Sequence, residues 1–381
     1  MITELKVSNF KTHRSTRIEM SALTLLTGMN SAGKTSLVQA LLLLRQSFFN
    51  NRLLSGVELN ESLCRIGTVN DALYRFAETG IMSFEFLDGQ SYRFDYNAGD
   101  ELGGTFVKKA FYSESVANEH LSKLSLFNDN FQYVSSMRWA GISHFERYDY
   151  EAAEHGQISC KLGQGEAVAH YLHLNGGNDA FDYMGMSGET TVAEQVLEWE
   201  RSISSNITID VQKGVTGGFD ILYGYRLPNV KPIAELRAEN VGFGISHSLP
   251  VITALVSAKP GSLIVLENPE AHLHPMGQSQ LAKLIARVAQ RGVQVIVETH
   301  SDHIINGILL ASKIFEDRSD GKKNCGIDRK NIRIYYIEKD ERTQTFAVAH
   351  PIKVEGRGRI DFQPKGFFDQ AEQDLYQING F

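Results

Sequence analysis

Few features of secreted, disulfide-stabilised or membrane-spanning proteins are present in this sequence. Cysteine is scarce: the 381 residues contain three, and an odd, widely spaced set argues against a disulfide framework or a zinc site. The three are Cys64, Cys160 and Cys325. The segment Met1–Val7 lacks the basic and apolar regions of a signal peptide, and the longest apolar stretches, around Leu41 and Val251, are too short to span a bilayer. We therefore expect a cytoplasmic protein that makes no contact with a membrane.

Basic residues are not in excess, since the formal net charge is −7 at pH 7. The composition thus lacks the electrostatic footprint of a nucleic-acid-binding protein, although a local basic groove can coexist with an acidic total. No heptad repeat is sustained over several turns, and no tandem repeat or low-complexity tract occurs. These absences argue against a long coiled-coil arm and leave a globular chain long enough for two or three domain-sized units.

A phosphate-binding loop is the clearest feature that the sequence does contain. Gly28–Thr35 reads GMNSAGKT, after the apolar run Leu23–Thr27 and before the helix-like run Ser36–Leu44. Strand, glycine-bounded turn and helix form the context in which backbone N–H groups and a helix N-terminus bind phosphate. The alternative is a Gly-Ser turn before a buried helix with an exposed lysine. The residues expected to bind the nucleotide are Asn30, Ser31, Ala32, Gly33, Lys34, Thr35 and Ser36.

The second half of such a site is an acidic residue at the end of another strand. Lys34 can reach the β- and γ-phosphates of a nucleoside triphosphate, and the Thr35 hydroxyl can bind Mg²⁺. Glu267 follows four apolar residues, Leu263–Leu266, and is expected at the end of a buried strand, where it completes the Mg²⁺ site. Because Glu267 is far from Lys34 in the sequence, a large insertion must separate two halves of one sheet. The alternative is a lone strand-end carboxylate.

Apolar strands alternate with an amphipathic helix in the last third of the chain, and this pattern predicts a parallel sheet covered on both faces. The expected elements there are strands at 261–267 and 293–300 and a helix at 279–290. Elsewhere the patterns predict strands at 2–7, 16–20 and 22–27, a hairpin at 82–96, a helix at 192–199, strands at 207–211 and 219–223, and a hairpin that joins 332–338 to 345–349.

Three segments together resemble the ABC-type ATPases of the RecF, SMC and OLD group. Leu266–Pro275 (LENPEAHLHP) is similar to their Walker B and D-loop region, Val297–Ser301 (VETHS) to their switch histidine, and Asn240–Ser246 to their ABC signature. The resemblance covers residues 1–50 and 235–305, with looser similarity at 136–138 and 163–166. Residues 366–370 resemble a small family of stand-alone bacterial ATPases of this group.

The resemblance implies an α/β fold, namely an ABC-type P-loop ATPase head with a mixed N-terminal β-sheet, a parallel core sheet and an inserted α/β middle region. Residues 1–100 would form the N-terminal half of the head with the Walker A loop, and residues 101–230 an inserted region for lid or partner binding. Residues 231–381 would form the C-terminal half, with the signature, Walker B, D-loop, switch histidine and a C-terminal hairpin and tail.

The resemblance also implies that two heads sandwich ATP and Mg²⁺, so that the chain forms a homo-oligomer of paired heads. Gly242, Gly244 and Ser246 would contact the γ-phosphate held by the other head. ATP would then close the pair and hydrolysis would open it. The alternative for this segment is a glycine loop ahead of a buried helix.

One position departs from the pattern of the group. In most ABC-type ATPases a glutamate follows the Walker B acid, whereas this chain has Asn268, which can position a water molecule but cannot accept its proton. Glu270, or Glu298 beside His300, could take that role. The expected catalytic residues are Glu267, Asn268, Glu270 and His300, and we expect slow hydrolysis.

The leading hypothesis is an ATP-binding switch ATPase that controls a separate effector such as a nuclease or toxin, by analogy with stand-alone ATPases of bacterial anti-phage defence. The residues after His300 lack the clustered carboxylates of the Toprim nuclease domain that relatives often carry. One alternative is a RecF-like DNA-repair or recombination ATPase that binds DNA directly, and a weaker one is a metabolite kinase. A transition-metal site is a further alternative for four histidines, His272, His274, His300 and His303.

Overall fold

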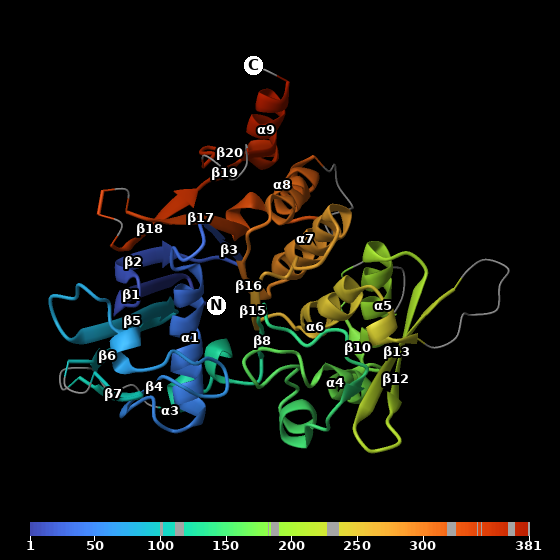
Figure 1. Cartoon of the computed structure of the whole chain (residues 1–381), viewed down its shortest axis with the longest axis horizontal. Helices are drawn as coiled ribbons and strands as arrows, with labels where there is room; N and C mark the ends of the chain where they lie inside the picture. The colour runs from blue at the N-terminus through green and yellow to red at the C-terminus, as the bar shows by residue number, and fades with distance from the viewer. Residues whose placement is uncertain are drawn as a thin grey trace.

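The fold contains two six-stranded sheets with helices between and around them (Figure 1). The computed structural model describes residues 1–99, 102–110, 118–181, 183, 190–226, 236–317, 325–340, 342–343, 345–364 and 370–379. The segment 366–369, in which we found similarity to stand-alone ATPases, lies outside the described residues.

The first sheet is antiparallel throughout, with the strand order β2-β1-β5-β6-β7-β4. Short turns join two of the neighbouring pairs, β1 to β2 and β5 to β6, and such turns require the joined strands to run in opposite directions. The N-terminal sheet expected to be mixed is therefore purely antiparallel. Its strands are β1 (Glu4–Phe10), β2 (His13–Glu19), β4 (Gly56–Glu58), β5 (Ile81–Asp88), β6 (Gln90–Asn97) and β7 (Phe106–Lys109).

The second sheet is the core sheet, with the order β18-β17-β3-β16-β15-β8. Five strands are parallel, and only the edge strand β18 is antiparallel to its neighbour. Strands from both ends of the sequence meet here, because β3 pairs with β16 on one side and β17 on the other. The strands are β3 (Leu23–Gly28), β8 (Phe131–Val134), β15 (Leu263–Glu267), β16 (Gln294–Glu298), β17 (Ile332–Lys339) and β18 (Ala347–Ile352).

Alternate residues of the core sheet enter two separate hydrophobic cores. Leu26, Val265 and Ile337 face the antiparallel sheet and α1, whereas Leu25 and Leu266 face the helices on the opposite side. This alternation follows from the two-residue period of a strand and explains why the central strands carry apolar residues on both faces. The helices are α1 (Lys34–Phe49), α2 (Val69–Ala72), α3 (Asn118–Leu121), α4 (Val168–Asn175), α5 (Val192–Ile203), α6 (Phe243–Ser257), α7 (Pro275–Gln290), α8 (Asp302–Glu316) and α9 (Gln370–Ile378).

Part of the segment 101–230 contributes to the two large sheets. Strand β7 lies in the antiparallel sheet, and β8 forms an edge of the core sheet beside β15. Helix α3 and residues 125–127 pack in the core of the antiparallel sheet. From β9 onward the segment forms a smaller α/β unit, to the right in Figure 1, whose core includes residues of α6. Its strands are β9 (His144–Phe145), β10 (Asp179–Ala180), β11 (Thr190–Thr191), β12 (Ile207–Lys213) and β13 (Phe219–Tyr225), joined by β14 (Leu236–Arg237); β19 (Val354–Glu355) pairs with β20 (Arg359–Ile360) near the C-terminus.

The predicted secondary structure is confirmed in its main elements, including both hairpins. The second hairpin does more than expected, because its first strand extends the core sheet beside β3. No helix among the described ranges combines the length and apolar character that crossing a bilayer requires.

Candidate nucleotide site

A cavity of about 480 Å³ lies where β3 and β16 end and α1 begins. It collects most of the residues that the sequence singled out, although they come from three distant parts of the chain. Ala32 is buried next to it rather than on its surface. The cavity is lined by Lys11, Thr12, Asn30, Ser31, Gly33, Lys34, Thr35, Ser36, Asn268, Glu298 and His300.

The loop between β3 and α1 depends on two glycines with left-handed backbone. Gly28 has φ of 127°, and a Cβ there would lie 2.0 Å from the carbonyl oxygen of Ile337 on β17. Gly33 has φ of 115°, and its Cβ would lie 2.4 Å from Thr12 Oγ1. Any larger residue would force either the loop or its neighbours to move, so the sequence pattern of the loop reflects steric limits as well as phosphate chemistry.

His13 stabilises the phosphate loop through a hydrogen bond to its backbone. Its Nε2 is 3.0 Å from the Gly33 carbonyl oxygen and its Nδ1 is 2.8 Å from Thr16 Oγ1. Burial lowers the pKa of His13 to about 4, so the imidazole is neutral at physiological pH. Since a carbonyl can only accept, Nε2 donates to Gly33 and Nδ1 accepts from Thr16. The sequence offers no local signal for this contact, because only the folded β1–β2 turn brings His13 to the loop.

Lys34 is folded back onto its own loop. Its Nζ donates to the carbonyl oxygens of Gly28 at 3.0 Å and Met29 at 2.7 Å. Burial lowers the pKa of Lys34, and the nearby Glu298 carboxylate acts in the opposite direction. The ammonium group is therefore placed inside the cavity, with bonds that it can exchange for phosphate oxygens.

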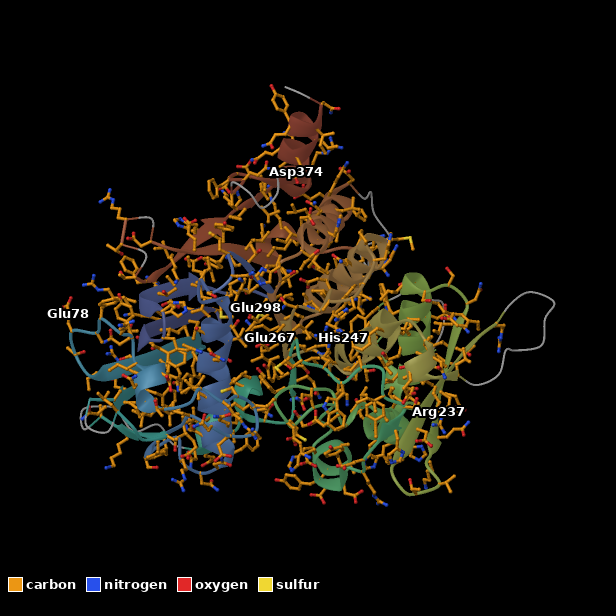
Figure 2. The ribbon with its side chains drawn as sticks, viewed as in Figure 1. Glu78, Arg237, His247, Glu267, Glu298 and Asp374 are labelled. Carbon is orange, nitrogen blue, oxygen red and sulfur yellow. The ribbon has the colours of Figure 1, made fainter. Side chains whose placement is uncertain are left out.

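The Thr35 hydroxyl is hydrogen-bonded to the carboxylate of Glu298. Thr35 Oγ1 donates to Glu298 Oε1 at 2.7 Å, while Glu298 Oε2 has no hydrogen-bond partner among the described residues. Glu267 lies beside Glu298 in the register of β15 and β16, and Figure 2 shows the two close together in the centre of the molecule. Glu267 Oε1 accepts instead from Tyr133 Oη at 2.9 Å.

The two neighbouring carboxyl groups lie in a poorly solvated place. Burial, and then the charge of Glu298, raises the pKa of Glu267 to about 7. Burial also raises the pKa of Glu298, against the effects of Thr35 and Lys34. Carboxylates that are costly to ionise without a counter-charge favour a cation between them and the Thr35 hydroxyl. These hard oxygen donors fit Mg²⁺, which takes one or two carboxylates together with phosphate oxygens and water.

Asn268 and Glu270 differ in their access to the cavity. Asn268 lines it, and its buried Oδ1 has no hydrogen-bond partner among the described residues. Glu270 does not line it: its Oε1 accepts from Thr299 Oγ1 at 2.7 Å and from the backbone N–H of His300 at 3.1 Å, and its Oε2 is buried without a partner among the described residues. His300 itself lines the cavity, and burial lowers its pKa, with a further contribution from Lys34.

Arg138 joins the end of β15 to α6, and it was noted in the sequence only as part of a loose similarity. All five N–H donors of its buried guanidinium have an acceptor: Nε donates to His247 O, Nη1 to Ser135 O and Glu267 O, and Nη2 to His247 Nδ1 and Asn268 O, at 2.7–3.1 Å. Burial lowers its pKa to about 10, so it stays charged. The backbone after Glu267 is thus tied to the helix that follows the signature segment.

The signature segment lies at the start of α6, outside the cavity of the same chain. Gly242 is exposed, whereas Ser246 is buried and its Oγ accepts from Gly141 N at 3.0 Å and donates to Phe243 O at 3.1 Å. A Cβ on Gly244 would lie 2.5 Å from the His272 carbonyl oxygen. The glycine at 244 therefore permits close packing of the signature segment against the D-loop segment.

The histidines of this region do not gather around a common point. Nowhere in the described part of the chain do three His, Cys, Asp or Glu side chains converge as a metal site. His272 packs instead with the rings of Phe243 and His247, at centroid distances of 4.7 Å and 5.0 Å.

Comparison with known proteins gives two family matches. The model described as AAA ATPase domain (AAA_15) matches residues 1–127 and 190–305, and the one described as protein of unknown function (DUF3696) matches residues 327–378. None of the curated proteins matches the chain.

Solved structures of SMC heads share the fold. One, an Smc head bound to the C-winged helix domain of ScpA, has a TM-score of 0.55 at 14% identity, covering 93% of this chain and 98% of that one. Another, an Smc head domain with an extended coiled coil bound to the C-terminal domain of ScpA derived from Pyrococcus furiosus, has a TM-score of 0.52 at 12% identity, covering 99% of each chain. The resemblance to the SMC group is thereby confirmed at the level of the fold.

Proposed function

The chain belongs to the AAA ATPase domain family and is an ATP-binding ATPase with the head fold of SMC proteins, and from this premise we propose that it works as a slow, ATP-dependent switch between paired heads. The observation that carries the proposal is the cavity that combines the phosphate loop with Asn268, Glu298 and His300. A phosphate loop alone would support nucleotide binding, but strand-end groups facing the same space support a reaction there.

In the proposed site the loop from Asn30 to Ser36 holds the phosphates, and Lys34 exchanges its bonds to the Gly28 and Met29 carbonyls for phosphate oxygens. The 2.7 Å and 3.0 Å bonds keep the ammonium in place until the nucleotide arrives. Mg²⁺ would be held by Thr35, Glu298 and Glu267, and when bound it neutralises charge on the phosphates. Glu298 thereby joins Glu267 in the expected metal set because of its contact with Thr35.

Slow hydrolysis is proposed because the group that faces the cavity after β15 is an amide. Asn268 lines the cavity, and its amide can position the attacking water by hydrogen bonding but cannot take its proton. Of the two carboxylates that could accept the proton, Glu298 lines the cavity but is assigned to Mg²⁺, and Glu270 does not line the cavity, although its Oε2 has no partner among the described residues. Neither is placed as a free base in the cavity, which supports slow hydrolysis. His300 would contact the γ-phosphate side of the same space.

Pairing of heads is proposed from the surface around the signature segment. Gly242 is exposed, Phe243 keeps 47% of its surface exposed and Met276, at the start of α7, 58%. A second copy that brings its phosphate loop to Gly242 and Gly244 would cover these apolar side chains. The buried Ser246 would have to exchange its bonds to Gly141 and Phe243 in order to take part. Arg138 connects this segment to the backbone of Glu267 and Asn268 by hydrogen bonds. Binding of a second head at the signature segment would therefore affect the geometry of the nucleotide site.

The proposal includes control of a separate effector by the paired heads. SMC heads of the same fold are known in complex with winged-helix and C-terminal domains of ScpA, which supports a partner protein on this head as well. We propose the segment 101–230, outside the strands that it contributes to the sheets, as lid or partner-binding region between head halves 1–100 and 231–381. A nuclease or toxin in an anti-phage system is the effector class that we propose.

The test is the mass of the full-length protein in solution by size-exclusion chromatography with light scattering, at micromolar concentration with no nucleotide, ADP, or ATP and Mg²⁺. We expect a doubled mass only with ATP and Mg²⁺. Lys34→Ala should stay monomeric with ATP because it loses the phosphate contact, and Phe243→Asp should bind ATP without pairing. Leu174→Asp, at an equally exposed apolar residue of α4, is the matched control and should pair normally. A wild-type mass that does not respond to ATP would refute the switch.

A further inference from the structure

A second cavity, of about 420 Å³, lies at the other end of α1 from the phosphate loop. The helix begins at Lys34 and its last turn, with Arg45 and Phe49, forms one wall. The helix has 16 residues and is therefore roughly 24 Å long at about 1.5 Å per residue, with one cavity at each end. The opposite wall comes from the middle region, including the short helical segment Asp149–Glu154 and residues 155–161.

Arg45 is held rigidly in the wall of this cavity. The guanidinium carbon lies 4.1 Å from the ring centroid of Phe131 and 4.6 Å from that of Phe49. Nη1 donates to the carbonyl oxygens of Leu126 at 2.7 Å and Asn128 at 2.9 Å. The side chain is 5% exposed, and burial lowers its pKa to about 9, so it remains mainly protonated at neutral pH.

The remaining edge of the same guanidinium is unused. Among the described residues, Nε and Nη2 of Arg45 have no hydrogen-bond acceptor, and no carboxylate lies within ion-pairing distance. Two parallel N–H donors in a fixed plane match the two oxygens of a carboxylate or phosphate. The charge of Asp129 acts on Arg45 without a direct ion pair, so the Nε–Nη2 edge of this buried cation, beside an open cavity, indicates where an anionic group can bind.

The opposite wall presents an aromatic ring that is also fixed in place. Tyr150 is 60% exposed, and its ring meets that of His155 edge-on at a centroid distance of 4.5 Å. His155 Nδ1 is in turn 2.9 Å from Asp129 Oδ1. A flat ring of a ligand could stack on Tyr150 or on Phe49, which is 45% exposed.

Charges on the lining restrict where the anionic group can sit. Lys161 adds a positive charge, whereas Asp129 and Glu151 are negative. The hydrogen bond with His155 does not remove the charge of Asp129, and that charge also acts on Arg45, whose pKa it raises against the effect of burial. Both carboxylates therefore disfavour an anion beside them, and the anion is expected at the Nε–Nη2 edge of Arg45. The volume lies within the range of cavities that bind small molecules and cofactors.

We infer that this cavity is a binding site for a small molecule that combines an aromatic ring with one carboxylate or phosphate group. The anion binds the free edge of Arg45 and the ring stacks on Tyr150. The ligand would lie between the last turn of the helix that starts at the phosphate loop and the middle region. Binding itself goes beyond the proposed switch and does not depend on it.

The experiment measures binding of three probes to the full-length Lys34→Ala protein, so that the phosphate loop does not contribute. The probes are phenyl phosphate, benzoate and inorganic phosphate, and affinities come from saturation-transfer NMR titrations, with phosphorus line widths for inorganic phosphate. We expect millimolar or tighter binding of phenyl phosphate, benzoate or both, and at least tenfold weaker binding of inorganic phosphate. The tighter of the two aromatic probes identifies the anion as phosphate or carboxylate.

Two further variants locate the site. Tyr150→Ala removes the stacking ring, and Arg45→Lys keeps the charge but loses the paired donors, so each should weaken the better probe at least fivefold. Phe181→Ala, at another exposed aromatic residue of the middle region, is the control and should leave affinity unchanged. If Arg45→Lys lowers the melting temperature strongly, the affinity of Tyr150→Ala alone is used to test the location of the site. Absence of binding by both aromatic probes, equal binding of inorganic phosphate, or unchanged affinity in Tyr150→Ala would overturn the inference, whatever the outcome of the pairing experiment.

Discussion

Glu200 on α5 is a fully buried carboxyl group whose surroundings favour its neutral form. Both of its oxygens lie 3.0 Å from Ser248 Oγ on α6, and the same Oγ lies 3.0 Å from the Ile245 carbonyl oxygen. A serine hydroxyl has one proton, and the Ile245 carbonyl can only accept. The arrangement is satisfied when Ser248 donates to Ile245 and a protonated Glu200 donates to Ser248.

The predicted consequence is a loss of stability as the pH rises. Burial raises the pKa of Glu200 to about 8, above the 4.5 of an exposed glutamate. The folded state therefore binds the proton more tightly, so the stabilisation is complete below pH 4.5 and is lost progressively up to pH 8. At about 1.4 kcal/mol per pH unit, the loss between pH 4.5 and pH 7 amounts to about 3 kcal/mol. Tyr223, the other ionisable group against Glu200, has its pKa raised by burial and stays neutral in this range.

Glu200→Gln tests this reasoning because an amide keeps the shape without the charge. The chain has two tryptophans, and one of them, Trp199, is the buried neighbour of Glu200, so tryptophan fluorescence reports on this region during urea unfolding. We expect the difference in unfolding free energy between Glu200→Gln and the wild type to grow with pH from 5 to 8 in favour of the variant. Glu198→Gln, on the same helix but half-buried, is the matched control and should follow the wild-type pH profile.

Parallel pH profiles for Glu200→Gln and the wild type would refute the assignment of a neutral Glu200. The same conclusion would follow if the wild type became more stable between pH 5 and pH 7 while Glu200→Gln did not, because that sign requires a carboxylate stabilised by the fold.

Three further predictions concern the nucleotide site. Gly33→Ala forces a Cβ against Thr12 and His13 and should weaken ATP binding at least tenfold by calorimetry, since left-handed strain alone costs about 1–3 kcal/mol; unchanged affinity would contradict the steric argument. Glu298→Gln should raise the Mg²⁺ concentration needed for half-maximal turnover at least tenfold while metal-free ATP binding persists, and an unchanged Mg²⁺ titration would remove Glu298 from the metal set. Arg138→Lys leaves at least two of five buried acceptors without a donor, at about 1–3 kcal/mol each, and should lower the melting temperature and slow turnover more than it changes ATP affinity. Wild-type melting and turnover in that variant would exclude the coupling role.

Most strands could be predicted because the hydrophobic pattern of each is contained in a few consecutive residues. The runs that became β3, β15 and β16 are mainly apolar, and the hairpin of β5 and β6 carries an Asp88-Gly89 turn. Strand β8 could not be placed in the same way, since four residues within a mixed segment carry too little periodicity. Its position beside β15 depends on pairing between residues more than a hundred positions apart.

The candidate site was predictable where chemistry follows from a local motif. The loop from Asn30 to Ser36 has such a motif, and the structure brings it together with Asn268 and His300. Glu298 ends a buried strand just as Glu267 does, so the rule that selected Glu267 applied to it equally. His13 and Arg138 had no such signal, because their partners are backbone carbonyls supplied by distant loops.

The pairing of β17 with β3 has a consequence for the order in which the protein can form during synthesis. Ile337 lies opposite Gly28, and the bare Cα of that glycine is what lets the two backbones approach. A nascent chain that has emerged only as far as α8 contains every nucleotide-binding motif but has one side of the loop-bearing strand unpaired. The binding loop should therefore reach its final shape late, after the last strands have left the ribosome, and a fragment ending before residue 332 should neither bind ATP tightly nor resist aggregation through the exposed edge of β3.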